Sequence, residues 1–212
     1  MPDYRDEFIQ IGTTRVRVLS GGNGEPLLFL HGAGGGGIWH PFMEELSKNY
    51  RVIAPEHPGF GLSDDPEWLE DISDWVLFYI DFLNELGLEK VHLVGHSMGG
   101  WLAAEFAVVY CDRLLSLTLV SAAGIYVPNV PTGDPFLWNA EERIRNVYYD
   151  QQLAEQLLNI QPTSEQIEIM VKNQETTAKI AWNPRWFNPK LQKRLSRIHV
   201  PTLVVWGEQD RI

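Results

Sequence analysis

The residue whose surroundings point most directly to chemistry is Ser97. It is the middle residue of Gly-His-Ser-Met-Gly at positions 95–99, which follows the short apolar run 91–94 and precedes small and apolar residues. So tight a strand-to-helix turn forces strained backbone angles, and side chains at its two glycines would collide with neighbouring elements. The pattern therefore predicts that the Ser97 hydroxyl is presented at the carboxyl end of a sheet.

A serine hydroxyl in this position is typical of a nucleophile that attacks a carbonyl group. A neutral hydroxyl reacts poorly and needs a base to take its proton. The amide of Met98, at the start of the following helix, is expected to point at the oxygen that becomes negative during the attack. Because the pentapeptide alone also occurs by chance, the interpretation depends on partners elsewhere in the chain.

A second loop with chemical potential, His-Gly-Ala-Gly-Gly-Gly-Gly at 31–37, follows the apolar run 26–30. Its glycine spacing, with Glu56 about 20 residues further on, formally fits a dinucleotide-binding fingerprint. That fingerprint requires neither the leading histidine, nor the Pro-Gly-Phe-Gly-Leu-Ser turn at 58–63, nor a later nucleophile turn, and all three are present. A phosphate-binding P-loop is excluded, because no Gly-Lys-Ser/Thr follows.

Composition limits the class of protein to which these loops belong. The 212 residues are 44% hydrophobic and 21% charged, which is typical of one soluble globular domain with an insertion. The net charge of −11 disfavours nucleic acid or an anionic membrane as partner. Cys111 is the only cysteine, so no intramolecular disulfide or thiolate metal site is expected. Without an apolar signal or a membrane-length run, we expect a cytoplasmic location.

Hydrophobic patterning predicts the elements that must position the two loops. Strands are expected at 8–11, 15–19, 26–30, 52–55, 91–94, 115–120 and 202–206, and helices at 38–46 and 71–86. Alternating strands and helices specify a mostly parallel, doubly wound sheet, in which chemistry occurs at the carboxyl ends of the strands. The loop at 31–37, Glu56, Ser97 and Ser121 all follow strands, so one edge of the sheet should hold the site.

The alternation stops between residues 124 and 195. Prolines at 128, 131 and 135 are followed by helical patterns around 137–149, 152–160 and 164–181, and Thr163 with Gln166 has the spacing of a capping box. We expect a helical lid whose inner face forms an apolar pocket wall. The alternative, that its aromatic residues form the core of the lid itself, stays open. These residues are Trp138, Tyr148, Tyr149, Trp182, Trp186 and Phe187.

Four motifs together resemble the α/β-hydrolase superfamily in their order and spacing. They are HGAG at 31–34, PGFGLS at 58–63, GHSMGG at 95–100 and WGEQD at 206–210. Within that superfamily the chain looks most like the lidded serine hydrolases, which include meta-cleavage-product (carbon–carbon bond) hydrolases and small carboxylesterases. The resemblance implies an α/β fold with core at 1–123, a lid at 124–195 and resumed core at 196–212. It implies no metal and no cofactor.

The resemblance also implies roles for individual residues. Ser97 matches the nucleophile, and the backbone amides of Ala33 and Met98 match the oxyanion hole, with Gly34 the next candidate. Asp210 matches the acid that orients the base histidine; Glu208 fits less well, and Ser121, where some relatives carry the acid, is not a carboxylate. Candidate residues of the substrate pocket are Gly34, Trp39, His96, Trp138, Trp182 and Trp186.

The base histidine has no obvious counterpart. The superfamily order is serine, acid, histidine, whereas only two residues follow Asp210. Of the six histidines, only His40 could plausibly approach the pocket, and we do not assign it as the base. The sequence thus predicts a C-terminally incomplete hydrolase that lacks its last strand and helix, is inactive or nearly so, and exposes the strand at 202–206 as a sheet edge.

The expected function is a serine hydrolase that acts through an acyl-enzyme on a small ester, or on a ketone cleaved at a carbon–carbon bond. A non-catalytic small-molecule receptor on the same fold is the alternative, and a dinucleotide-binding module is the third possibility. Epoxide hydrolases and haloalkane dehalogenases share the fold but carry an aspartate at the nucleophile turn, so Ser97 speaks against both. The only partner expected is a small-molecule substrate.

Overall fold

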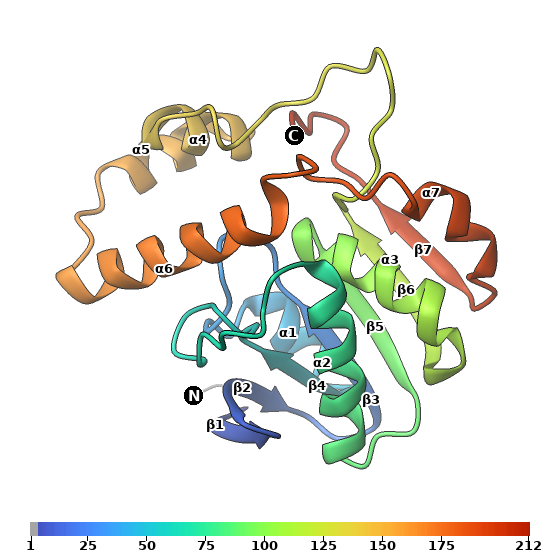
Figure 1. Cartoon of the computed structure of the whole chain (residues 1–212). Coiled ribbons are helices and arrows are strands. Elements are labelled where there is room, and N and C mark those ends of the chain that lie inside the picture. The colour runs from blue at the N-terminus through green and yellow to red at the C-terminus, as the bar shows by residue number, and fades with distance from the viewer. Residues whose placement is uncertain (1–3) are drawn as a thin grey trace.

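The computed structural model describes residues 4–212 as a seven-stranded sheet with helices on both faces (Figure 1). The strand order is β1-β2-β4-β3-β5-β6-β7, and every pair from β4 onward is parallel. The predicted mostly parallel, doubly wound sheet is confirmed. The strands are β1 (Tyr4–Ile11), β2 (Thr14–Gly21), β3 (Glu25–Leu30), β4 (Tyr50–Pro55), β5 (Val91–His96), β6 (Leu114–Val120) and β7 (Thr202–Val205).

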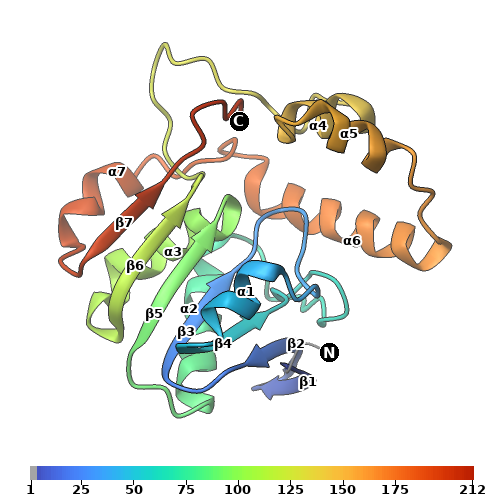
Figure 2. The same cartoon turned by 180° about the vertical axis from the view of Figure 1, so that it is seen from behind.

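The central strands are buried on both faces, because their alternate side chains enter two different hydrophobic clusters. In β3, Leu28 and Leu30 pack with α2 (Ile72–Glu85) and α3 (Met98–Tyr110), whereas Leu27 and Phe29 pack with Met43 of α1 (Pro41–Leu46). Helix α1 therefore covers one face of the sheet, and α2 and α3 cover the other (Figure 2). This two-sided burial explains the continuous apolar runs in the sequence.

Local signals fix the ends of the first two helices. The Asp71 side chain accepts from the Ser73 amide and forms a capping box with Asp74, and Gly87, with φ +63°, follows the last turn of α2. The predicted helix at 71–86 is therefore confirmed. Helix α1 is shorter than the predicted 38–46: it begins at Pro41, which favours the first helical position and keeps His40 extended.

The segment between β6 and β7 is helical, as predicted. It contains α4 (Ala140–Val147), α5 (Gln151–Leu158), α6 (Ser164–Ala181), the short α7 (Leu191–Arg194) and a 3-10 turn at Leu195–Arg197; a second 3-10 turn, Cys111–Arg113, precedes β6. The capping box of Thr163 and Gln166 is present at the start of α6. Helix α7, four residues long, was not predicted, because so short a helix shows no periodicity. Figure 1 shows α6 crossing above the sheet, with α4 and α5 beyond it.

Strand β7 forms one edge of the described sheet, with Leu203 and Val204 more than half exposed. Its exposure agrees with the expectation of an open edge at 202–206. In the described part of the chain, no helix combines the length and the apolar character that crossing a membrane would require.

Candidate active site

Ser97 occupies the sharp turn between β5 and α3, with φ +54° and ψ −118°. A non-glycine residue in this region is strained, so the surrounding structure must hold it there. The Ser97 amide donates to the Val120 carbonyl (2.9 Å), and its own carbonyl accepts from the Ala123 amide (3.1 Å). These bonds join the turn to the end of β6, and Ser97 remains partly exposed at the carboxyl edge of the sheet, as predicted.

The glycines of this turn are required by close approaches of the backbone. A Cβ atom on Gly99 would lie 2.2 Å from the Leu30 carbonyl oxygen, and one on Gly95 would lie 2.3 Å from the Gly99 carbonyl oxygen. The predicted collision at both positions is confirmed. Helix α3 can therefore pack directly against the end of β3, which brings its first residues beside the glycine-rich loop.

The glycine-rich loop and Ser97 are adjacent. A Cβ atom on Gly32 would lie 3.1 Å from Ser97 Cβ. Within residues 4–212, neither the Ala33 amide nor the Met98 amide donates a hydrogen bond to a backbone carbonyl. Met98 is the first residue of α3, where the helix leaves the amide unpaired. Two amides without partners thus belong to segments that meet at Ser97, and this arrangement could bind a negative oxygen.

Two buried histidines hold the base of the loop in place. The His57 amide donates to His31 Nε2 (3.0 Å), so His31 Nδ1 carries the proton that bonds the Gly32 carbonyl (2.8 Å). His57 Nε2 in turn donates to the His31 carbonyl (3.0 Å), and the Tyr79 hydroxyl donates to His57 Nδ1 (2.5 Å). Burial lowers the pKa of His31 to about 4 and that of His57 well below its usual value. Both rings are therefore neutral, and their role is to hold the loop in place. Sequence reasoning missed Tyr79, whose only signal was its place among the apolar residues of α2.

The Glu56 carboxylate is buried and bonded to neighbouring protein groups. Its carboxylate accepts from the Leu62 amide (2.9 Å) and lies 3.8 Å from the Arg17 guanidinium. Burial raises the pKa of Glu56, and the bond from Leu62 and the charge of Arg17 oppose that shift. A Cβ atom on Gly61 would lie 2.0 Å from this carboxylate. The carboxylate is thus not free to bind a ribose, which removes the main support for a dinucleotide site.

Asp210 lies beyond β7 on the same edge of the sheet as Ser97, because β5, β6 and β7 are parallel. The Ser121 amide donates to the Val205 carbonyl (2.9 Å) and joins the ends of β6 and β7. Desolvation lowers the pKa of His96, the Asp210 carboxylate opposes that shift, and His40 adds to it. Asp210 and His40 are therefore both near enough to His96 for their charges to act on it. The Asp210 carboxylate itself accepts from the Ile212 amide (3.0 Å).

No histidine in residues 4–212 is hydrogen-bonded to the Ser97 hydroxyl. His92 bonds the Ser116 hydroxyl (2.8 Å) and lies near Glu25, towards the amino ends of the strands. His199 lies 3.4 Å from Asp112, before the start of β7. His40 precedes α1, where its exposed ring stacks on Phe42 (5.7 Å).

Two of the predicted pocket aromatics pack within the lid. Trp186 stacks on Phe136 (4.9 Å), and Trp182 meets the same ring edge-on (5.3 Å). The Arg185 guanidinium lies 4.1 Å above the Trp182 ring and pairs with Asp134 (2.7 Å). Trp186 also packs against the main core, and its indole nitrogen is buried without a partner. Phe136 joins the two tryptophans, and nothing in its sequence context indicates this role.

Trp138, Gly34 and Trp39, which are also pocket candidates, lie in three different places. Trp138 packs against Gly133, whose amide donates to the Arg211 carbonyl (2.8 Å), beside Asp210. Gly34 is exposed on the glycine-rich loop. Trp39 is engaged elsewhere: its ring stacks on Tyr4 (5.0 Å) and its indole N–H donates to Glu44 (2.8 Å). The structure therefore places Trp39 in the packing of α1.

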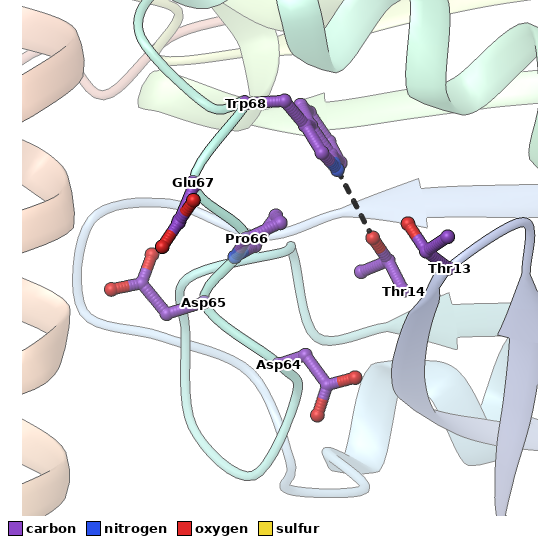
Figure 3. A pocket seen from close by; sticks show the side chains of 7 residues that line it. All are labelled: Thr13, Thr14, Asp64, Asp65, Pro66, Glu67 and Trp68. Carbon is purple, nitrogen blue, oxygen red and sulfur yellow. Dashed lines mark hydrogen bonds between the residues drawn. The ribbon is translucent and has the colours of Figure 1, made fainter.

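A shallow hollow on the surface is separate from this site (Figure 3). No candidate residue lines it. Its wall includes the Trp68 indole, which donates to the Thr14 hydroxyl (3.2 Å), and Asp64, which accepts from the Arg15 amide (2.7 Å). Within residues 4–212, no group of three or more His, Cys, Asp and Glu side chains is arranged to hold a metal ion.

Comparison with known proteins gives a consistent result. Residues 25–169 match the family model described as alpha/beta hydrolase fold. The chain is 32% identical over 228 residues to the 2-hydroxy-6-oxononadienedioate/2-hydroxy-6-oxononatrienedioate hydrolase of Paraburkholderia phymatum, covering 94% of this chain and 77% of that protein. It is 36% identical over 134 residues to the 2-hydroxymuconate semialdehyde hydrolase of Pseudomonas sp. strain CF600, covering 60% of this chain and 46% of that protein.

Solved structures of similar proteins share the architecture. The 2-hydroxy-6-oxo-6-phenylhexa-2,4-dienoate hydrolase of Rhodococcus sp. strain RHA1 aligns with a TM-score of 0.76 at 25% identity, covering 99% of this chain and 83% of that one. A bacterial membrane phospholipase A aligns with a TM-score of 0.78 at 25% identity, covering 99% of this chain and 72% of that one.

Proposed function

Because the chain belongs to the alpha/beta hydrolase fold family and is a hydrolase, we propose that Ser97 is its nucleophile in a serine-hydrolase mechanism. One observation carries the proposal: Ser97 is strained, partly exposed and placed between two unpaired amides. The loop beside Ser97 bears the Ala33 amide, and the next residue along the chain bears the Met98 amide. Strain at a functional side chain persists only where the surrounding structure over-determines it. A receptor that merely enclosed a ligand would not require this strain.

In the proposed reaction, Ser97 Oγ attacks a carbonyl carbon while a base takes the hydroxyl proton. The carbonyl electron pair moves to its oxygen, and the amides of Ala33 and Met98 bind the resulting oxyanion. Loss of such a donor typically costs about 3 kcal/mol in the barrier. Asp210 orients the base and stabilises its protonated form. The oxyanion then re-forms the carbonyl, the bond from the carbonyl carbon to the leaving group breaks, and the leaving group takes the proton from the base. Water, deprotonated by the same base, attacks the acyl group and releases it as an acid, and the base then returns the proton to Ser97 Oγ.

The proposed substrate is a small, partly apolar ester, or a ketone cleaved at a carbon–carbon bond. The names of the relatives support the second option, since several are hydrolases of 2-hydroxy-6-oxo-dienoates. Incubation with a short p-nitrophenyl ester and with a 2-hydroxy-6-oxo-dienoate, each with imidazole added as a diffusible base, separates the two. Preferential turnover of the dienoate would support carbon–carbon cleavage by this chain, whereas turnover of the ester alone would exclude it.

The proposal assigns the base to none of the six histidines. His31 and His57 are buried and fully bonded, His92 and His199 have partners away from the site, and His96 and His40 make no bond to the Ser97 hydroxyl. The 212 residues by themselves are therefore expected to be inactive or nearly so. A diffusible base should then replace the missing group in part.

Fluorophosphonate labelling with and without imidazole tests this proposal. Imidazole is expected to accelerate formation of a Ser97 adduct about tenfold or more, since a positioned base contributes about 10²–10⁴. The Ser97→Ala variant is the control and should carry no adduct on this peptide, as read by mass spectrometry. Absence of a Ser97 adduct under both conditions would contradict the assignment of the nucleophile. Rapid, Ser97-dependent ester turnover without imidazole would instead show that the chain contains its base.

A further inference from the structure

Helix α6 buries several polar residues beside the apolar Ile180 and Ala181, and it leaves several apolar residues exposed. Its buried residues include Asn173, Thr176 and Thr177, which are at most 6% exposed. Ile167, Met170 and Val171, in contrast, are each about half exposed. A helix on a protein surface normally shows the opposite distribution. The inner face of α6 is therefore suited to hydrogen bonding.

The partners of that inner face are backbone groups of the turn at 58–63. Asn173 Oδ1 accepts from the Gly61 amide (2.9 Å), and the Thr176 hydroxyl donates to the Gly59 carbonyl (2.7 Å). Lys172 Nζ donates to the Gly61 carbonyl (3.0 Å) and also to that of Ser63. Three side chains of α6 thus fix the helix to a turn that lies more than 100 residues earlier in the sequence.

Asn173 alone among these three residues also reaches the glycine-rich loop. Its Nδ2 donates to the Gly34 carbonyl (3.5 Å), and a Cβ atom on Gly35 would lie 2.6 Å from the same nitrogen. A carboxamide can accept on one side and donate on the other, which a carboxylate of the same shape cannot do. Asn173 therefore bridges the turn at 58–63 and the loop that carries Ala33.

The loop has few other restraints. Four of its residues in succession, 34–37, are glycines, which lose more conformational freedom on ordering than any other residue. Inside the loop, the Gly35 amide donates to the Gly32 carbonyl (3.1 Å), and that carbonyl also accepts from His31 (2.8 Å). Both of these bonds lie within the loop itself. In the described part of the chain, Asn173 supplies the hydrogen bond that ties residues 33–37 to another element.

We propose that Asn173 is a positioning residue that holds the glycine-rich loop, and with it the Ala33 amide, through α6. The catalytic consequence rests on the proposed function, because it assumes that this amide binds the oxyanion. The mechanical part does not, since it concerns only the order of the loop.

Backbone ¹⁵N relaxation of residues 33–35 tests the mechanical part without any turnover. In the unmodified chain, their order parameters should be about 0.85, as in rigid backbone, and Asn173→Asp should lower them below about 0.6. This variant retains the acceptor for Gly61 and loses the donor to Gly34. Thr176→Val is the matched control: it removes another bond between α6 and the core but none to the loop, and should leave these values unchanged.

The inference is overturned if residues 33–35 are already mobile in the unmodified chain. This measurement does not depend on the folding of any variant. It is equally overturned if Asn173→Asp leaves them rigid, or if Thr176→Val loosens them to the same extent. Asn173→Ala serves as the second variant and should behave as Asn173→Asp does.

The catalytic consequence has a readout of its own. Asn173→Asp should slow imidazole-dependent formation of the Ser97 adduct about tenfold, whereas Thr176→Val should not slow it. Mobile loop residues together with an unchanged adduct rate would refute the role of Asn173 in positioning the oxyanion donor. Absence of a Ser97 adduct in the unmodified chain would refute the proposed nucleophile, and the relaxation result would still decide whether Asn173 orders the loop.

Discussion

At the scale of single residues, the site depends on glycines, which have no side chain, as much as on the reactive groups themselves. Gly99 lets α3 approach the end of β3, and that approach brings Ser97 beside Gly32. The positive φ of Ser97 follows from the same tight turn. Its strain is balanced by bonds from the end of β6, so neighbouring strands hold the nucleophile turn in place.

Gly99→Ala should therefore lower the free energy of unfolding by about 2 kcal/mol, since its Cβ atom meets the backbone of β3 at 2.2 Å and neither strand nor helix can move away cheaply. Urea denaturation measures the change. The control is Gly34→Ala, where a Cβ atom would have no neighbour within 4 Å and the stability should change by less than about 0.5 kcal/mol. Equal effects of the two substitutions would contradict this account.

These residue-scale features could be predicted in part from the sequence. The spacing of glycines around Ser97 carries the steric requirement directly, so both collisions were foreseen. The bridge made by Asn173 could not be foreseen, because its partners at Gly34 and Gly61 lie more than 100 residues away. A lone asparagine in a helix shows no sign of such partners.

At the scale of elements, α6 shows that periodicity predicts where a helix lies better than it predicts what surrounds the helix. Its bounds and its capping box at Thr163 were predicted correctly from spacing and side-chain chemistry. The sequence predicts an apolar inner face for the lid; the buried face of α6 carries the apolar Ile180 and Ala181 but also the polar Asn173, Thr176 and Thr177. The reason is that this face meets backbone carbonyl and amide groups of a turn, which need hydrogen-bond partners.

Substitutions on α6 should consequently have the reverse of their usual effects. Thr176→Val should lower the free energy of unfolding by about 1 kcal/mol, because it leaves the Gly59 carbonyl without its donor. Met170→Gln replaces a half-exposed apolar side chain and should change stability by less than about 0.5 kcal/mol. Thermal or urea denaturation of both variants checks this, and greater damage from Met170→Gln would show that the outer face is the one that packs.

At the scale of the whole molecule, parallel strands bring distant segments to one edge. The loops after β3, β5 and β7 meet there, which places the glycine-rich loop, Ser97 and Asp210 on the same side. This convergence could be predicted because it follows from strand order and direction alone. The position of Trp39 could not, since its contact with Tyr4 depends on how the β1–β2 hairpin packs beside α1.

The two buried histidines should make the stability of the whole fold sensitive to acid. The folded pKa of His31 is lowered from 6.5 to about 4, so the native state binds fewer protons than the unfolded state in that window. Stability should therefore be complete above about pH 6.5 and decrease as the pH falls towards 4, by up to about 3 kcal/mol from His31. The raised pKa of Glu56 acts in the opposite direction near the lower end of this range.

Urea denaturation between pH 7 and pH 4.5 measures this dependence. The His31→Asn variant is less stable throughout but should lose stability less steeply with acid, because one buried imidazole is absent. A free energy of unfolding that stays constant or rises as the pH falls from 6.5 to 5 would contradict the neutral, fully bonded histidine pair.

The most direct measurement of the central claim is a crystal structure of the chain with a phosphonate bound covalently to Ser97. The phosphoryl oxygen takes the place of the oxyanion, so it should accept hydrogen bonds of about 3 Å from the amides of both Ala33 and Met98. An adduct on another residue, or a phosphoryl oxygen that contacts neither amide, would contradict the assignment of this edge of the sheet as the active site.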